Sequence, residues 1–480
     1  MRCTPAPRAR SGRARHATHR PTRSTAAWTA LIALFAALAC LAAAAPRVGA
    51  APVSGDELWR KVYDDTGGWT DIAMALVLAP GGKGVYVTGS ILPNGAKSDL
   101  ALIKYKPSGG RAWLRTFDGA AHGNDEGLAL ACDRARNVYV GGYVDKSLGQ
   151  DFLLVKYDTG GHRKWLRTYD GAAHGDDNIL ALAVDARSNV YAAGRSEGAG
   201  TNWDAALVKW TPTGRRAWVR RYNGAADFAD EFGALVIDTA RGRVYAAGVA
   251  AVDAQTKTWL LIRYSVAGTR VWTQTFGAPN TTSDSGSVAL TPGGAVLQAG
   301  SGGQTAIHAA DALLGKWTAA GAIVWSDGYS AASTDYFADL AVDRHGTIFT
   351  VGHTKTGLNN YDALVCRFTP AGTLDDFVTI GGDTYDDYFN AVACDGAGNV
   401  YATGTVGTAL YDDDWVTVKF SNDLDALWQP CAREHDVDLS DRPWAIAVRG
   451  AGSANPGVYV TGKGSQSSFA WDWMTIKYKP

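Results

Sequence analysis

The sequence predicts an all-β protein, a single eight-bladed β-propeller with four antiparallel strands per blade. Three observations predict it: a repeat of nearly fixed length, strand-like segments in every repeat, and chain ends that complement each other. The repeat contains a short apolar phrase ending in glycine, at 85–89, 138–142, 190–194, 244–248, 296–300, 348–352, 400–404 and 458–462. Its closing glycines are 53, 52, 54, 52, 52, 52 and 58 residues apart. A period of roughly 40–50 residues built from strands is typical of propeller blades.

One repeat shows the four strands of a blade in order. Residues 127–132 (GLALAC) predict the first strand, 137–143 the second, 151–157 (DFLLVKY) the third and 164–169 (KWLRTY) the fourth. Asp, Gly, Ser and Asn lie between them, as the turns of hairpins require. The first strand is rich in alanine in every repeat, so we place it at the crowded axis of the ring. The fourth strand carries Trp, Arg and Tyr, and we place it at the outer edge.

The two ends of the chain are expected to share one blade. The eighth third-strand motif ends at Lys477, and the chain stops at Pro480 without a fourth strand. Residues 58–63 (LWRKVY) have the composition of a fourth strand and precede the first inner strand. This N-terminal strand should complete the last blade and pair its open edge. The propeller then occupies residues 56–480 as one domain.

Residues 1–50 differ in composition from the rest of the chain. They hold eight arginines and no acidic residue, followed by an apolar run at 26–45 and small residues up to Ala50. This pattern predicts a signal peptide cleaved near Ala50. The alternative is a retained N-terminal membrane anchor, because about 20 apolar residues can span a bilayer. We expect a secreted protein, extracellular or in the cell envelope, that does not contact the membrane after its leader is removed.

Charge and cysteine content exclude several classes of protein. Without the leader, 38 basic and 47 acidic residues give a net charge of −9. This argues against nucleic acid as a partner, because such a partner requires a basic face. Cys132 and Cys394 occupy the same place in distant repeats and are not expected to pair. The sequence does not decide whether Cys366 and Cys431 form a disulfide. We expect the protein to be a monomer.

Aspartate recurs at two places in the repeat. One Asp precedes each inner strand: Asp71, Asp125, Asp177, Asp230, Asp284, Asp335, Asp387 and Asp441. Another opens seven of the third strands: Asp99, Asp151, Asp204, Asp311, Asp362, Asp414 and Asp472. These residues either ring one mouth of the channel, where they could hold calcium, or cap turns and pair with the basic residue of their own blade. The second interpretation is favoured, because a residue present in every blade serves what every blade needs. We therefore expect no cofactor or metal site, with calcium as the open alternative.

Tryptophan stands nine residues after the basic residue of the third strand in most repeats. The series is Trp113, Trp165, Trp218, Trp272, Trp325 and Trp428, with Trp59 serving the shared blade and Asp376 interrupting it. The same reasoning predicts that these rings pack one blade against the next and do not bind sugars. Each indole N–H then needs a hydrogen-bond acceptor.

The repeat resembles a known family. Its pattern is D-x-x-L-[IV]-K-Y-[DK]-x-x-G-x-x-x-W, then Y-[DN]-G, then an Asp, the inner strand and N-V-Y-[VA]-[TA]-G. This resembles the bacterial SBBP-type β-propeller repeat family over essentially all of 56–480. The resemblance implies a secreted or surface protein, in a family mostly without assigned activity.

A second, more distant resemblance concerns the turn between the third and fourth strands. The run from Tyr157 to Trp165 is similar to the tryptophan-docking motif of quinoprotein (PQQ-like) propellers, which also have eight blades. The vicinal cysteines of those enzymes are absent, and none of their catalytic residues or metal ligands can be assigned to a position here. The likeness therefore supports the fold and not dehydrogenase activity.

The last three repeats depart most from the pattern, with an acidic run at 412–414 and a longer charged loop at 432–440. Exposed aromatic rings beside carboxylates could hold a polysaccharide or a peptide. The alternative is drift of the repeat, with ordinary core tryptophans. The predicted ligand-binding residues are Asp412, Asp413, Trp415, His435, Trp444, Trp471 and Trp473.

The sequence predicts a non-catalytic binding or interaction module of unknown ligand. A surface glycan, a peptide or a protein would be its partner, and no catalytic residue is assigned. The alternative is a quinoprotein-like or carbohydrate-active enzyme that uses carboxylates at the mouth of the channel.

Overall fold

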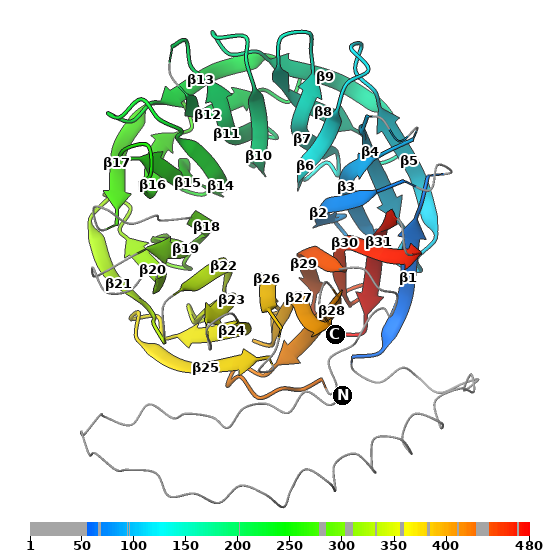
Figure 1. The fold of residues 1–480 in the computed structure, drawn as a ribbon, viewed down its shortest axis with the longest axis vertical. Helices are drawn as coiled ribbons and strands as arrows, with labels where there is room; N and C mark the ends of the chain where they lie inside the picture. Colours follow the sequence, from blue (N-terminus) through cyan, green and yellow to red (C-terminus); the bar gives the residue numbers. More distant parts are fainter. Residues whose placement is uncertain are drawn as a thin grey trace, which may run out of the picture.

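The computed structural model describes residues 55–65, 69–93, 95, 97–200, 202–277, 285–302, 311–331, 334–355, 360–381, 385–409, 412–428, 441–467 and 470–480. Every regular element is a β-strand, and the strands form eight sheets around a central channel (Figure 1). This confirms the predicted eight-bladed propeller. In these ranges no helix has the length and apolar character needed to cross a membrane. The leader predicted at 1–50 lies outside the described residues.

Each blade runs from a strand at the channel to a strand at the outer rim (Figure 1). The inner strands are β2 (Ile72–Leu78), β6 (Asp125–Cys132), β10 (Asp177–Val184), β14 (Glu231–Asp238), β18 (Ser285–Leu290), β22 (Asp335–Val342), β26 (Asp387–Cys394) and β29 (Arg442–Arg449). The second strands are β3 (Val85–Ile91), β7 (Val138–Asp145), β11 (Val190–Glu197), β15 (Arg243–Ala251), β19 (Val296–Gly302), β23 (Ile348–Lys355), β27 (Val400–Ala409) and β30 (Gly457–Ser467).

The third and fourth strands complete the blades, which we number one to eight from β2. The third strands are β4 (Asp99–Tyr105), β8 (Gln150–Tyr157), β12 (Trp203–Trp210), β16 (Lys257–Ser265), β20 (Asp311–Trp317), β24 (Tyr361–Phe368), β28 (Asp412–Phe420) and β31 (Ala470–Tyr478). The outer strands are β5 (Arg111–Phe117), β9 (Arg163–Tyr169), β13 (Arg216–Tyr222), β17 (Arg270–Phe276), β21 (Ile323–Tyr329), β25 (Leu374–Ile380) and, for blade eight, β1 (Glu57–Tyr63).

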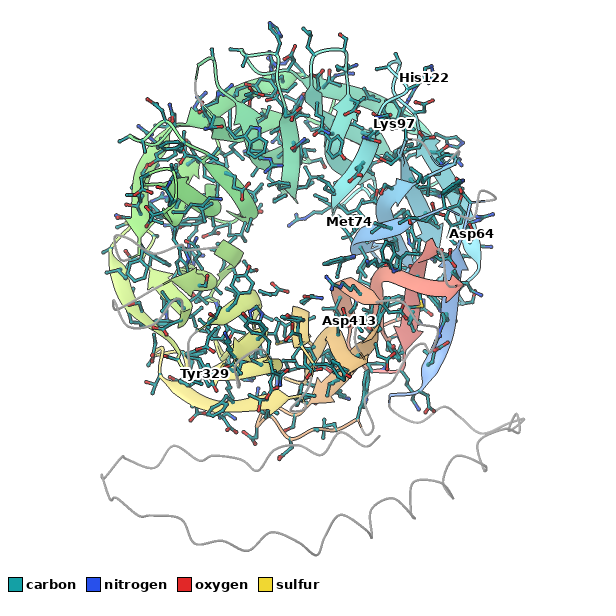
Figure 2. All side chains as sticks on the ribbon, viewed as in Figure 1. Asp64, Met74, Lys97, His122, Tyr329 and Asp413 are labelled. Carbon is teal, nitrogen blue, oxygen red and sulfur yellow. The ribbon has the colours of Figure 1, made fainter. Side chains whose placement is uncertain are left out.

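Position in the blade explains the composition of each strand. All seven residues of β3 are buried, because a blade packs between two neighbours and its middle strands face apolar surroundings on both sides. The sequences of these middle strands are therefore continuously apolar and do not alternate between apolar and polar residues. The cores lie between blades: Leu100 and Leu102 of blade one pack with Val138 and Val140 of blade two. Met74 on β2 lies beside the channel (Figure 2), which confirms the predicted place of the alanine-rich strand.

The glycine that closes each repeat has a structural cause. In every blade the pairing of the inner and second strands is interrupted by a β-bulge, for example between Ile179 and Ala181 in blade three. Opposite that bulge lies Gly194, where a Cβ atom would overlap the carbonyl oxygen of Asn178. The same overlap occurs at Gly89, Gly142, Gly248, Gly352, Gly404 and Gly462. Only glycine lets the bulged backbone approach this closely.

The repeated tryptophans join one blade to the next, as predicted. Trp113 donates its indole N–H to the carbonyl oxygen of Thr159 in the following blade at 3.1 Å, and Lys104 donates to the same oxygen at 3.0 Å. Beneath the ring lies Gly161, whose Cβ position would be 2.8 Å from a ring carbon. Its φ of 81° also favours glycine. The pairs Trp165 with Lys156, Trp218 with Lys209, Trp272 with Arg263 and Trp59 with Lys477 repeat the arrangement.

Where the tryptophan is missing, the next blade compensates. Asp376 replaces the tryptophan of blade six, and Leu424 replaces the turn glycine of blade seven at a φ of 57°. Leu424 is only 2% exposed and joins the core that Val378 borders. An aliphatic side chain is thus buried at this junction, where the other described junctions have an indole ring over a glycine.

The chain ends close the ring as predicted. β1 pairs antiparallel with β31, with Trp59 opposite Lys477 and Tyr63 opposite Trp473. In blade eight the turn between the third and outer strands is formed by the two ends of the propeller, one from each terminus. Lys479 donates its N–H to the carbonyl of Asp56 at 2.9 Å, just as an unbroken turn does in blade one.

Blade seven shows three strands, β26 to β28, and an isolated bridge from Phe420 to Ala426. The rest of its predicted outer strand falls in residues 429–440, outside the described part of the chain. Trp428 is still seen to pack in the expected way, with Gly55 beneath its ring.

Candidate functional site

The aspartates before the inner strands are buried wherever the structure describes them, and their carboxylates bond to nearby backbone, as two examples show. Asp71 accepts hydrogen bonds from the N–H groups of Asp65 at 2.8 Å and Leu92 at 3.0 Å. Asp230 accepts from Gly224 at 2.5 Å and Ala251 at 2.9 Å. Each carboxylate thus ties the loop before its strand to the loop after the second strand. This confirms, for these residues, that the repeated aspartate serves the blade.

The loops that lead into the inner and third strands meet on one face of the ring, here called the loop face. The N–H of Asp125 donates to the carbonyl of Ser98 in the preceding blade at 2.7 Å, and that of Asp230 donates to Trp203 at 2.7 Å. The predicted common face is therefore confirmed.

Three clusters of carboxylates lie on the loop face, at the junctions of blades eight and one, one and two, and two and three. In each cluster one oxygen per residue lies within 4.8 Å of the others. The clusters are Asp64, Asp65 and Asp71; Asp99, Asp118 and Asp125; and Asp151, Asp170 and Asp177. Such oxygens are the ligands that calcium takes. Asp118 and Asp170, which follow the outer strand in the sequences F-D-G and Y-D-G, were not predicted as members of a site.

Burial, with the neighbouring carboxylates, raises the pKa of several of these groups. Burial is the largest cause at Asp71, where it raises the pKa to about 7, and at Asp99, where it raises the pKa to about 6. The pKa of Asp177 and that of Asp472 are likewise raised to about 6, first by burial. These carboxyl groups therefore hold a proton well above the usual pH range of an aspartate.

The next junction, between blades three and four, replaces the cluster with an ion pair. Arg221 lies 3.0 Å from Asp204 and donates to the carbonyls of Ser196 and Glu197 at 2.9 and 2.7 Å. Asn223 stands where the other junctions have the third aspartate. Among the described residues, clusters of three carboxylates therefore occur at the junctions of blades eight to three, where Asp118 and Asp170 also contact His122 and His174 at 2.7 Å.

We expect the melting temperature to fall by roughly 2–5 °C between about pH 5 and about pH 8. A carboxyl group whose pKa is raised by folding stabilises the fold fully below its unfolded pKa. That stability is lost as the pH rises through the folded pKa, here about 6 to 7. Burial lowers the pKa of His353 to about 4. The stability that depends on this group therefore rises with pH up to about pH 6.5, opposite to the effect of the carboxyl groups. Thermal denaturation followed by circular dichroism over this range measures the slope.

The variant Asp99→Asn should flatten this slope, because it removes one of the raised carboxyl groups. The matched control is Asp253→Asn, on an exposed loop where backbone hydrogen bonds lower the pKa of the carboxyl. Its slope should equal that of the unmodified chain. A melting temperature that rises with pH, and that falls when EDTA is added, would instead show that these carboxylates bind a cation in their ionised form.

The predicted ligand-binding residues of blades seven and eight do not form one exposed platform. Trp415 and Trp473 are fully buried in the cores between blades, so the expectation that they are exposed is wrong. Trp471 is half-buried, with the Lys463 ammonium 3.6 Å from its ring centre. Trp444 is 37% exposed on β29. Asp413, labelled in Figure 2, forms an ion pair with Arg442 at 3.0 Å.

Some of the predicted residues cannot be placed. His435 and Cys431 lie outside the described residues, and so does the lengthened loop at 432–440. Asp412 begins β28, but its side chain is not among those described. Cys366 is buried and has no disulfide partner in the described part of the chain.

The structure brings together an aromatic group that the sequence analysis missed, at the junction of blades six and seven. The ring of His353 lies 4.9 Å from that of Tyr361 and 5.0 Å from that of Tyr388, centre to centre. All three are half-buried on or near the loop face. None of the three is among the predicted ligand-binding residues, because His353 and Tyr388 belong to no pattern that recurs in every repeat.

A cavity of about 750 Å³ lies on the opposite face, here called the turn face. It is lined by the turns of blades eight, one and two, which lie side by side in Figure 1. Its polar and charged lining residues are Lys83, Tyr86, Lys104, Lys106, Ser108, Arg136, Thr159, Asn455 and Lys477. None of the described residues that line it is a carboxylate, a histidine or a cysteine. The cavity can therefore donate hydrogen bonds and attract negative charge.

Similarity to known proteins supports the fold and identifies no family. No protein-family model matches the chain, and no curated protein matches its sequence. The solved structure of Sqt1 from Chaetomium thermophilum is similar over 89% of this chain and 100% of that one, with 13% identity and a TM-score of 0.56.

Two further solved structures match less closely. Virginiamycin B lyase from Staphylococcus aureus matches 73% of this chain and 94% of that one, with 10% identity and a TM-score of 0.41. The periplasmic gluconolactonase PpgL of Pseudomonas aeruginosa matches 64% and 84%, with 10% identity and a TM-score of 0.42. At such identities, the likeness to Sqt1 shows that the chain has the β-propeller fold.

Proposed function

We propose that this protein is a secreted or cell-surface propeller that binds a ligand without transforming it. The observation that carries the proposal is the cavity on the turn face. Its volume suits a small ligand, and its lining offers five cationic side chains and several donors. Its described lining includes no histidine, cysteine or carboxylate to act as a general base or nucleophile. The resemblance to SBBP-type repeats, which typify bacterial surface proteins, supports the same function.

The location and partners follow from the same proposal. The leader predicted at 1–50 would direct the chain out of the cytoplasm, and the closed ring would act there as a monomer. Its partner would be a glycan, a peptide or a protein of the cell surface or surroundings, and the net charge of −9 disfavours nucleic acid.

One observation favours the enzyme alternative. Carboxyl groups with a raised pKa, such as Asp99, lie beside other carboxylates on the loop face. Pairs of carboxyl groups whose pKa values differ are the acid and base of many glycosidases. A carbohydrate-active or quinoprotein-like enzyme would use that face.

The test is to incubate the chain from Val53 onward with neutral and anionic oligosaccharides and with peptides. Binding is measured by calorimetry, and the recovered ligand by mass spectrometry. We expect at least one ligand to bind and to be recovered with its mass unchanged. A cleaved or oxidised product would overturn the proposal in favour of the enzyme. A rise in melting temperature with PQQ and calcium would point to the quinoprotein-like alternative.

A further inference from the structure

Two adjacent blades beside the cavity lack an aspartate that other blades carry where the inner strand ends. Five blades have it: Asp133, Asp185, Asp238, Asp343 and Asp395. Blade one has Ala79 there, whose N–H bonds to Gly84 at 2.9 Å as that of Asp133 bonds to Asn137 at 3.0 Å. Blade eight has Arg449 at the same place, and blade five has Thr291.

In blades two, three and seven this aspartate accepts a hydrogen bond from a tyrosine of the second strand, whereas in blade four the Tyr245 hydroxyl has no partner although Asp238 is present, and blade six has Phe349 instead. Tyr139 donates its hydroxyl hydrogen to Asp133 at 2.9 Å, and Tyr401 does the same to Asp395 at 3.0 Å. Asp133 also lies 3.9 Å from the ammonium of Lys156 on the third strand. One carboxylate thus accepts from the tyrosine hydroxyl and offsets the charge of the lysine.

In blade one both groups are left without that carboxylate. Tyr86 is fully buried, and its hydroxyl has no hydrogen-bond partner. Lys104 lies with its ammonium 4.9 Å from the centre of the Tyr86 ring and donates to the carbonyl of Thr159 at 3.0 Å. All three residues line the cavity. A buried hydroxyl without a partner is unfavourable, so an acceptor bound in the cavity would be stabilised by it.

Four further cations surround the cavity. Lys477 is buried and donates to the carbonyl of Pro107 at 3.3 Å. Lys83, Lys106 and Arg136 are exposed, and none of them forms an ion pair with another described residue. Asp158, an acidic residue of the neighbouring turn that does not line the cavity, is already paired with Lys164 at 3.5 Å and His162 at 3.2 Å.

We propose that this cavity binds a compact ligand bearing two or more phosphate or sulfate groups. Four of its five cations are lysines, whose ammonium groups bind phosphate or sulfate as point charges, and five cations with no carboxylate in the described lining suit a ligand with several negative charges. The Tyr86 hydroxyl supplies a donor that would bond to one oxyanion. The proposal rests on the proposed function, since it names the class of ligand for the same site.

The distribution of charge across the ring agrees with this proposal. The same blades, eight to two, carry carboxylate clusters on the loop face and cations on the turn face. A charged anion would therefore be repelled from one face and drawn to the other.

The first experiment is calorimetric titration of the full ring with four probes at matched ionic strength. These are inorganic tripolyphosphate, a heparin-derived sulfated disaccharide, citrate and a neutral disaccharide. We expect tripolyphosphate or the sulfated disaccharide to bind, and the better of the two identifies phosphate or sulfate as the source. Citrate, which carries fewer negative charges than tripolyphosphate, should bind at least about ten-fold more weakly. Equal binding of citrate, or no binding of either oxyanion, overturns the proposal.

The second experiment compares two tyrosine variants. Tyr86→Phe removes a hydroxyl with no partner, so the free protein should melt at the same or a higher temperature. Its affinity for the better oxyanion probe should fall by about ten-fold, the loss of one hydrogen bond to a charged group. The matched control is Tyr139→Phe, which should lower the melting temperature because Asp133 loses a donor, and should leave the affinity unchanged. Unchanged affinity in Tyr86→Phe would contradict the assigned donor.

A charge reversal tests the rim of the cavity. Arg136→Glu should weaken oxyanion binding by at least about ten-fold, because an exposed cation becomes an anion at the mouth. Arg187→Glu is the control, since Arg187 is an exposed arginine in the corresponding turn of blade three. Its affinity should match that of the unmodified ring. Equal weakening in both variants would show attraction to the whole surface and would overturn the site.

The outcomes separate this inference from the proposed function. A neutral oligosaccharide or a peptide that binds unchanged, with affinity insensitive to Arg136→Glu, would leave the binding function standing and remove the oxyanion site. A phosphorylated or sulfated ligand that binds and is then hydrolysed would keep the site and remove the non-catalytic function.

Discussion

A chain that begins at Asp65, without β1, should lose its cooperative unfolding transition or melt more than roughly 10 °C lower than the full ring. β1 pairs with β31 along its length, and Trp59 packs on Gly109 of the next blade. Its removal leaves β31 as an open edge that includes Met474 and Ile476. Such an edge promotes association between molecules. Circular dichroism and size-exclusion chromatography measure the two effects.

The control for this truncation is a chain that begins at Val53. It keeps Gly55, which forms the split turn with Lys479, and it should melt like the full chain. A synthetic peptide of residues 53–65 should raise the melting temperature of the truncated ring by adding the missing strand. A scrambled peptide should not. If the truncated chain melts like the full one, strand exchange between the two termini does not hold the ring together.

What repeats in the sequence was predicted, because each blade needs the same local solution. Trp113 needs one carbonyl and one glycine in the next blade, and the nine-residue spacing from Lys104 revealed it. The closing strand was predicted from what the last repeat lacks. Both inferences depend on contacts that recur around the ring.

What does not repeat was missed or misjudged. Trp415 was taken as exposed because it follows the predicted mouth residue Asp414, but third strands face cores on both sides, and adjacent residues there are both buried. The cavity depends on Ala79 and Arg449 standing where other blades have aspartate. Only a position-by-position comparison of the repeats, with the turns aligned by their hydrogen bonds, could have revealed that absence.

The acidic clusters were predicted in part, because most of their residues were noted but their proximity was not. Asp99 and Asp125 were both noted as repeated residues, and the Y-[DN]-G motif was noted too, which Phe117-Asp118-Gly119 replaces in blade one. Their proximity arises because the third-strand loop of one blade meets the inner-strand loop of the next. That contact crosses a blade junction, and no spacing within one repeat encodes it.

The variant Gly248→Ala should destabilise the ring by about 3 kcal/mol. A Cβ atom there would overlap the carbonyl oxygen of Glu231 and lie 2.8 Å from the Cα of Phe232. Both neighbours are backbone in a hydrogen-bonded ladder, so neither can move without breaking the pairing of β14 with β15. Phe232 is fully buried, so a shift of its backbone would also disturb the core between blades three and four. Chemical denaturation measures the change in the free energy of unfolding.

The matched control is Gly396→Ala in the exposed turn after β26. No atom lies within 4 Å of its Cβ position, and its φ does not require glycine. The same added methyl group should change stability by less than about 0.5 kcal/mol, or raise it slightly by restricting the unfolded chain. A similar loss in both variants would mean that glycine serves flexibility in this chain. A loss confined to Gly248→Ala would show that the glycine ending each repeat exists because the bulge in the inner strand leaves room for a hydrogen atom alone.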